Sequence, residues 1–342
     1  MDWSRLTYRS SRITDSEIVM NIHTRLRILV LVAIVLGCFS GQVNSAKTKA
    51  KKPLPEGTPV LWRQPSDIAS RDLFLGPGGT SMRPDLRRLT FLKEEKGGYS
   101  KKFRVRDASG HEWVAKIGKE AQSETAAVRL LWGIGYVTEV NYLVPEVTIP
   151  GKGTFQNVRF EARPKGWKRL EEWNWSRNPF NGTPELQGLK IMMALINNWD
   201  LKDSNNRIVY IDDNGRSELQ YIISDLGATF GHASTTPLFW RFTRSRNNPS
   251  KYAKTKFLEK IKGDRVVLHY GGKNRGLFKD ISVRDAAWMA SLLEQLSDRQ
   301  IQDSFKAANY TPAQISLLTQ AVRSRSNELR NLRPSENVSR NR

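Results

Sequence analysis

Residues 200–205 read Asp-Leu-Lys-Asp-Ser-Asn, and residues 225–227 read Asp-Leu-Gly. The second motif follows the apolar run 219–223, which has the composition of a short strand. Together the motifs offer two carboxylates and one carboxamide, and Mg²⁺ prefers such hard oxygen ligands in near-octahedral geometry. This pair of motifs decides how the rest of the chain is interpreted.

A hairpin is predicted between the two motifs. The apolar runs 208–211 and 219–223 flank Asp-Asn-Gly at 213–215, and Asn-Gly strongly favours a tight turn between antiparallel strands. Such a hairpin would bring Asn205 and Asp225 to the same end, as a shared metal site requires. The segment 185–199 has helical spacing of apolar residues and would deliver Asp200 to the loop that follows it.

A lysine and a glutamate upstream form a second candidate pair. Residues 113–116 read Trp-Val-Ala-Lys, a short apolar run that ends in Lys116. A helix is expected from Ser123 onward, because apolar residues recur there at helical spacing. Glu124 lies in the first turn of this expected helix, where its carboxylate could meet Lys116. Glu120 is the alternative partner, and Glu124 is preferred because it lies inside the periodic segment.

Residues 89–92, 101–106 and 111–117 are expected to form three strands. The loop between the first two contains Gly97 and Gly98, and glycine lets backbone N–H groups approach anions closely. This loop could therefore cover phosphate groups. The glycine cluster at 76–79 competes for that role, but it precedes the first strand and is interpreted as a plain loop. Further strands are expected at 140–147 and 154–162, and helices at 286–296 and 312–329.

The order of these features resembles the protein-kinase-like superfamily. That resemblance covers about residues 89–230 and implies an α+β, two-lobed fold. An antiparallel-sheet N-lobe would span 61–163, and a reduced, mostly helical C-lobe would span 164–329. The backbone around 161–163 would form the hinge that grips adenine.

The resemblance also implies ATP and Mg²⁺ as cofactors and a role for each quoted residue. Those roles are phosphate contact by Lys116, Gly97 and Gly98, support of that lysine by Glu124, orientation of the acceptor hydroxyl by Asp200, charge neutralisation by Lys202, and metal binding by Asn205 and Asp225.

Several residues depart from the pattern of ordinary protein kinases. Asn198 and Trp199 stand where those enzymes carry His-Arg, and Leu226 replaces the usual Phe. No Ala-Pro-Glu follows, and only about 115 residues remain after Asp225. The chain therefore resembles the atypical branches more closely: HipA-type bacterial, phosphoinositide and secretory-pathway kinases. We interpret it as a bacterial, exported branch of the superfamily.

The N-terminal sequence predicts export. Arg25 and Arg27 precede the apolar segment 28–39, which is short for a membrane span. Residues 1–46 are expected to form a signal peptide, with Met20 as an alternative start. Ordinary cleavage before Ala46 is favoured over lipid anchoring at Cys38, and either would place the protein in the periplasm, the envelope or the extracellular space.

Composition limits the remaining possibilities. A chain of 342 residues with 39% hydrophobic residues and ten Trp can bury a sizeable core. Its single Cys lies in the expected signal peptide, so the mature chain would contain no disulfide. Residues 47–60 are expected to be a basic linker, and 330–342 a flexible basic tail.

The net charge of +21 is concentrated where a kinase-like protein would hold its acceptor. Residues 241–285 contain thirteen Lys or Arg against four acidic residues. This stretch favours an anionic acceptor, either an acidic protein or a phosphorylated small molecule, and the alternative is association with an anionic envelope surface. No known nucleic-acid-binding motif accompanies the charge, which disfavours a nucleic-acid partner.

Three functional hypotheses follow from the sequence. The first is an exported, ATP- and Mg²⁺-dependent phosphotransferase that acts on a hydroxyl group. The second is a non-catalytic, pseudokinase-like binding protein of the envelope, because the exterior of a bacterium holds little ATP. The third is a small-molecule kinase that resembles the aminoglycoside phosphotransferases.

Overall fold

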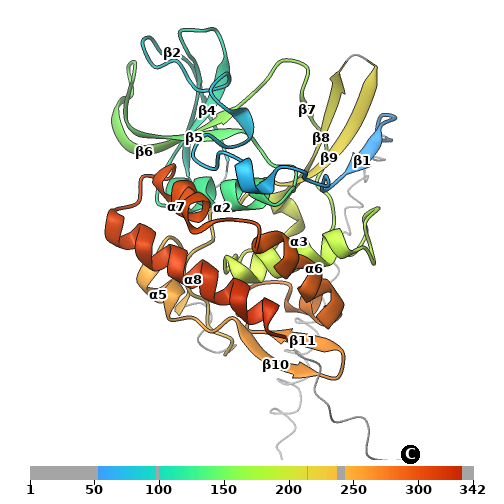
Figure 1. Cartoon of the computed structure of the whole chain (residues 1–342). Helices are drawn as coiled ribbons and strands as arrows, with labels where there is room; N and C mark the ends of the chain where they lie inside the picture. The colour runs from blue at the N-terminus through green and yellow to red at the C-terminus, as the bar shows by residue number, and fades with distance from the viewer. Residues whose placement is uncertain (1–52, 98–99, 214, 237–242, 333–342) are drawn as a thin grey trace, which may run out of the picture. The chain divides into compact units, whose positions relative to one another are not determined.

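The computed structural model describes residues 53–97, 100–213, 215–236 and 243–332, and Leu54–Arg342 forms one compact unit (Figure 1). The predictions for the signal peptide 1–46, Met20, Cys38 and Gly98 fall outside the described residues, as do those for 47–52 of the linker and 333–342 of the tail. Among the helices of the described part, none is long and apolar enough to cross a membrane.

The first lobe is built on a five-stranded antiparallel sheet with the strand order β2-β3-β4-β6-β5 (Figure 1). Its strands are β2 Thr90–Glu95, β3 Lys101–Arg106, β4 Glu112–Ile117, β5 Asn141–Ile149 and β6 Gly153–Ala162. Strands β3 and β4 agree with the expected bounds to within one residue. The helix α2, Glu120–Gly133, packs against β4, β5 and β6.

The two faces of this sheet differ sharply in polarity. Residues directly opposite each other in antiparallel strands share a face, and Phe103, Ala115 and Phe160 are aligned in this way. They belong to a buried apolar cluster that forms the core of the lobe. Lys116 and Arg159 are also directly paired, on the opposite face, so the sheet turns a charged surface towards the site described below.

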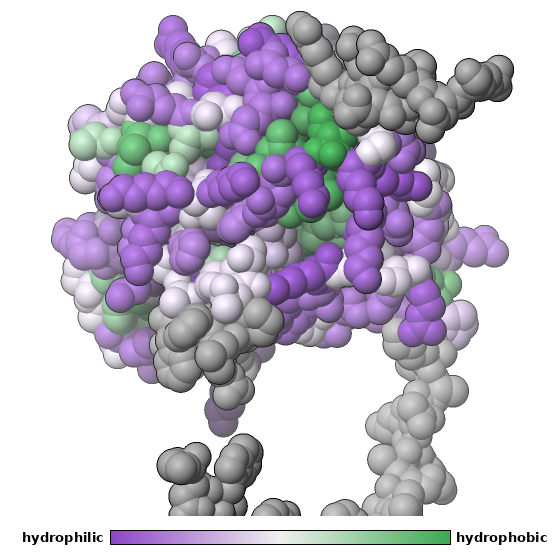
Figure 2. All heavy atoms as spheres, turned by 90° about the horizontal axis from the view of Figure 1, so that it is seen from below, coloured by the Kyte–Doolittle hydropathy of each residue, from purple (hydrophilic) through white to green (hydrophobic). Residues whose placement is uncertain are grey.

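The second lobe is mostly helical. Its helices are α3 Pro184–Leu195, α5 Pro249–Ala253, α6 Val283–Leu293, α7 Asp298–Lys306 and α8 Pro312–Arg330. Helix α8 packs against α5, α6 and α7, and α3 packs against α6 (Figure 1). Side-chain caps define where α6, α7 and α8 begin, because each starts with a Ser or Thr whose hydroxyl and backbone bond reciprocally to the third helical residue. On the face seen in Figure 2, hydrophilic residues cover most of the surface.

A second sheet with the strand order β1-β9-β8-β7 contains the expected hairpin. Its strands are β1 Thr58–Val60, β7 Lys168–Arg169, β8 Asn206–Asp213 and β9 Arg216–Ile223. Strands β8 and β9 pair in antiparallel register from Asn206↔Ile223 to Asp213↔Arg216. A separate hairpin joins β10, Leu258–Lys262, to β11, Arg265–Leu268.

Three local expectations are corrected by the structure. Helix α2 begins at Glu120 rather than Ser123, so Glu124 lies in the second turn. Helix α3 ends at Leu195 rather than continuing to 199, because Asn197 adopts a left-handed conformation with φ of 51°. The cluster 76–79 is not a plain loop: Gly76–Gly78 forms a 3₁₀ helix that packs against α2.

Candidate active site

Six of the eight residues selected from the sequence line one cavity of about 390 Å³. They are Lys116, Glu124, Asp200, Lys202, Asn205 and Asp225. They come from β4, from α2, from the loop after α3 and from the residues after β9, so both lobes contribute to the cavity. Gly97 does not line it. From this part of the chain, Ser100 and Lys102 do.

Lys116 lies between two glutamates. Its Nζ is 3.1 Å from Oε2 of Glu161 and 3.8 Å from Oε1 of Glu124. Glu120, the alternative partner, instead forms an ion pair with Arg246 and accepts a hydrogen bond from the hydroxyl of Ser100. Of the two candidate carboxylates, the structure therefore places Glu124 beside the lysine.

A buried charge network behind Lys116 was missed in the sequence. Arg159 is fully buried, and its guanidinium is 3.0 Å from Glu124, 2.8 Å from Glu161 and 3.4 Å from Glu139. Arg169 joins the network through Glu139 at 2.7 Å. Arg159 and Glu161, which alternate with apolar residues along β6, were the available signal, because a buried charge requires a partner of opposite sign.

Burial and neighbouring charges set the pKa values of this network. Burial raises the pKa of Glu124 to about 7, despite the opposing effects of Arg159 and Lys116. Burial also acts to raise the pKa of Glu161, but the nearby cations, with Lys116 foremost, hold that pKa well below its ordinary value. Burial and Arg159 act to lower the pKa of Lys116, yet the surrounding glutamates outweigh both and raise it.

Glu124 gives the stability of the fold a pH dependence of defined sign. Its folded pKa of about 7 lies above the ordinary glutamate pKa of 4.5, so its contribution to stability is complete below about pH 4.5 and is lost as the pH rises through about 7. Between about pH 5 and about pH 8, we expect the free energy of unfolding to fall by roughly 3 kcal/mol more in the wild type than in Glu124→Gln. Urea unfolding at the two pH values measures this difference. Glu294→Gln, at an exposed site, is the control, and a pH-independent difference for Glu124→Gln would contradict the assignment.

Asp200 is held by backbone and side-chain contacts on several sides. Its backbone N–H donates to Oδ1 of Asn198 at 3.2 Å, and its carbonyl accepts from Nδ2 of Asn205 at 2.6 Å. One carboxylate oxygen lies 3.0 Å from Nζ of Lys202, and the other lies 2.5 Å from Nζ of Lys273. Burial acts to raise the pKa of Asp200, but the hydrogen bonds from Lys273 and Lys202 outweigh it and lower that pKa.

The hairpin brings Asn205 and Asp225 together. The backbone N–H groups of Ser224 and Asp225 both donate to the carbonyl of Asn205, at 2.8 and 3.2 Å. Oδ1 of Asp225 accepts from the N–H of Gly227 at 3.2 Å. Glycine is required at 227, because a Cβ there would lie 2.7 Å from Cβ of Glu120.

The donor atoms at this end fit a hard cation. Nδ2 of Asn205 is committed to the carbonyl of Asp200, which leaves Oδ1 as the acceptor atom of the amide. Oδ1 of Asn205 and the carboxylate of Asp225 would together hold Mg²⁺. Within the described residues, no group of three His, Cys, Asp or Glu side chains could bind a metal ion by itself. The other ligands would be water and phosphate oxygens, as is usual for Mg²⁺ at nucleotide sites.

The backbone N–H groups of the expected hinge, residues 161–163, form hydrogen bonds within the protein. The N–H of Ala162 donates to the carbonyl of Val140, and the N–H of Arg163 donates to that of Glu112, both at 2.9 Å. Pro164 has no N–H to offer. Residues 162–164 line a second cavity of about 200 Å³, together with residues of β8 and β9. The backbone N–H groups of 162 and 163 are therefore already engaged and do not face a nucleobase as free donors.

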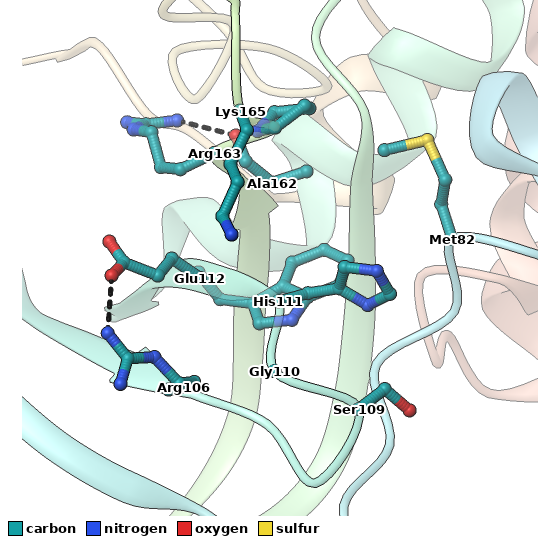
Figure 3. A pocket seen from close by; sticks show the side chains of 11 residues that line it. Met82, Arg106, Ser109, Gly110, His111, Glu112, Ala162, Arg163 and Lys165 are labelled. Atoms are coloured by element: carbon teal, nitrogen blue, oxygen red, sulfur yellow. Dashed lines mark hydrogen bonds and ion pairs between the residues drawn. The ribbon is translucent and has the colours of Figure 1, made fainter.

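A larger cavity of about 940 Å³ lies beside the turn between β3 and β4, and residues 162–164 line it as well (Figure 3). Figure 3 shows Arg106 paired with Glu112 at its edge, at a distance of 2.9 Å, and Lys165 on the segment that follows β6. Ala162 and Arg163 of the expected hinge line this cavity, but none of the six residues grouped in the 390 Å³ cavity does. Size alone therefore does not identify the site, whereas the grouping of chemically matched side chains does.

Comparisons with known proteins find similarity among solved structures. No protein-family model matches the chain, and no curated protein matches it. Among solved structures, the chain is similar to a Helicobacter pylori protein described as the proinflammatory kinase CtkA, with a TM-score of 0.45 and 10% sequence identity. The similarity covers 72% of this chain and 96% of the other.

The class of the fold follows from the chain's own architecture. It is an α+β fold with an antiparallel-sheet lobe, a helix beside the lysine strand and a mostly helical second lobe (Figure 1). Asp200 and Asp225 lie in loops at the edge of the second lobe that lines the cavity. This is the two-lobed protein-kinase-like fold expected from the sequence, and that expectation is confirmed.

Proposed function

We propose that the protein is an exported, ATP- and Mg²⁺-dependent phosphotransferase that acts on a hydroxyl group. The observation that carries this proposal is the single cavity lined by Lys116, Asp200, Asn205 and Asp225 from both lobes. An ammonium group, an acceptor-orienting carboxylate and two oxygen donors for a cation are the groups that phosphoryl transfer needs.

Each side chain has a role that its contacts support. Bound Mg-ATP would supply the transferable phosphoryl group and part of the charge that stabilises its transfer. Lys116, held by Glu124 and Glu161, would contact the phosphates, and Asn205 with Asp225 would hold the cation.

The acceptor would meet the opposite side of the cavity. Asp200 would accept a hydrogen bond from the acceptor hydroxyl and fix its direction, since both oxygens of the carboxylate are already aligned by lysines. Lys202 would neutralise charge on the transferred group, as the corresponding lysine of the superfamily does.

Positive charge around this entrance supports an anionic acceptor. Lys202 and Lys273 flank Asp200, and the guanidinium groups of Arg244 and Arg246 lie about 5 Å from the ring of Trp199. We propose an acidic protein or an anionic small molecule as the acceptor, with association to an anionic envelope surface as a further consequence. Export, and the assignment to an atypical branch of the superfamily, rest on the sequence features at 1–46 and 198–199.

A second candidate function is supported by the hinge. Because the N–H groups of Ala162 and Arg163 are already engaged, these two residues offer a nucleobase no free backbone donor. Asn198 and Trp199 also replace the His-Arg of ordinary kinases. These observations favour a pseudokinase-like binding protein of the envelope as the alternative.

One experiment separates the two functions. The protein from residue 47 onward would be titrated with Mg-ATP by thermal shift, then incubated with Mg-ATP and analysed by intact-mass spectrometry for self-phosphorylation. We expect saturable stabilisation that is lost in EDTA, together with the added mass of a phosphoryl group. Stabilisation without phosphoryl transfer to itself or to acidic acceptor proteins supports the binding protein. No stabilisation at millimolar Mg-ATP rejects the phosphotransferase.

A further inference from the structure

A segment between β11 and α6 is docked on the loop that carries Asp200. Three hydrogen bonds from this segment reach three carbonyl groups of residues 198–201. They are Tyr270 Oη to Asn198 O at 2.8 Å, Lys273 N to Trp199 O at 2.9 Å and Asn274 Nδ2 to Leu201 O at 2.5 Å. Residues 270–274, here called the strap, therefore have a fixed register along the loop.

Close packing makes the position of the strap specific. A Cβ at Gly272 would lie 2.6 Å from Cα of Trp199 and 2.2 Å from the hydroxyl of Tyr270. A Cβ at Gly271 would lie 2.1 Å from the carbonyl of Ala233. Only glycine permits this approach, so the two glycines place the next residue, Lys273, directly beside the loop.

The strap delivers an ammonium group to a carboxylate that the proposed reaction uses. Nζ of Lys273 lies 2.5 Å from Oδ1 of Asp200, while Nζ of Lys202 lies 3.0 Å from Oδ2. Lys202 is only two residues from Asp200 in the chain, whereas Lys273 is brought there by the tertiary fold. Each oxygen of the carboxylate is therefore held by its own ammonium group.

We propose that Lys273 is a positioning residue for Asp200. It holds the carboxylate in the direction from which it orients the acceptor hydroxyl, and it acts through Asp200 without taking part in nucleotide binding. This inference rests on the proposed phosphotransferase function. It assigns a role to a residue that lies outside both motifs from which the site was recognised.

The test compares turnover with nucleotide binding in Lys273→Met. Met keeps the apolar stem of the side chain up to Cε and the backbone hydrogen bond to Trp199, but it lacks the ammonium group. With Mg-ATP as the probe, we expect kcat for ATP hydrolysis or self-phosphorylation to fall by roughly 10- to 100-fold, because misplacement of a positioning group by about 1 Å has that effect. The Kd for Mg-ATP should change by less than about threefold. Lys273→Arg should recover part of kcat, and Lys279→Met, at an exposed position nearby, should match the wild type.

The possible outcomes distinguish failure of the inference about Lys273 from failure of the phosphotransferase function on which it rests. A wild-type protein that neither binds nor turns over Mg-ATP rejects the proposed function and this inference together. An active wild type with an unchanged kcat in Lys273→Met overturns the inference alone. So does an equal loss of kcat in Lys273→Met and Lys273→Arg, or a loss that appears entirely in the Kd. If Lys273→Met unfolds, Lys273→Gln is measured in its place with the same criteria.

Discussion

Asp225→Asn should abolish the Mg²⁺-dependent stabilisation of the protein by ATP. In the wild type, the N–H of Gly227 donates a hydrogen bond to Oδ1 of Asp225 at 3.2 Å, and the substitution keeps an oxygen that can accept it. It removes the negative charge that would bind the cation. At a free ligand concentration of about 100 times the Kd, the wild type should gain about 2.7 kcal/mol, which is several degrees in Tm. The variant should gain close to nothing in a thermal-shift titration with Mg-ATP.

The same hairpin provides the matched control. Asp212 is an exposed residue near the turn between β8 and β9, at the opposite end of the hairpin from Asp225. Asp212→Asn should keep the full response to Mg-ATP. If Asp225→Asn and Asp212→Asn respond equally, Asp225 does not bind the cation and the site must be reassigned. If both variants have the Tm of the wild type without ligand, the fold is intact.

Local signals in the sequence predicted much of this architecture. Strand β3 follows from the alternation of Phe103 and Val105 with charged residues, and the β8–β9 hairpin follows from Asn-Gly at 214–215. In each case the information lies within about ten residues, so no tertiary contact is needed to read it. The convergence of Asn205 and Asp225 then follows from the geometry of the hairpin.

Contacts between distant segments explain what sequence reasoning missed. Arg159 meets Glu124 across 35 positions, and Lys273 meets Asp200 across 73, so neither pair leaves a local pattern. The glycine loop was predicted from composition alone, and Gly97 does not line the cavity. The start of helix α7 was missed although a local signal for it exists. Ser297 and Gln300 have the spacing of a capping box in the sequence, and they form one in the structure.

Arg159→Met should strongly destabilise the fold. Removing this guanidinium leaves the carboxylates of Glu124, Glu139 and Glu161 buried with too little positive charge. Loss of one partner from a buried ion-pair network typically costs about 3–5 kcal/mol, because the remaining charge is uncompensated. Urea unfolding of the protein without ligand would show this loss as a lower midpoint with a similar slope.

A second substitution distinguishes charge imbalance from lost packing. Arg159→Met combined with Glu161→Gln removes one positive and one negative charge, so it should recover a substantial part of the loss if uncompensated charge is the cause. If the double variant is less stable by the sum of both single effects, packing of the arginine dominates and the electrostatic account of the network is wrong. Recovery would mean that the network provides little net stability. Its contribution would then be the placement of Lys116, since Glu124 and Glu161 contact both that lysine and Arg159.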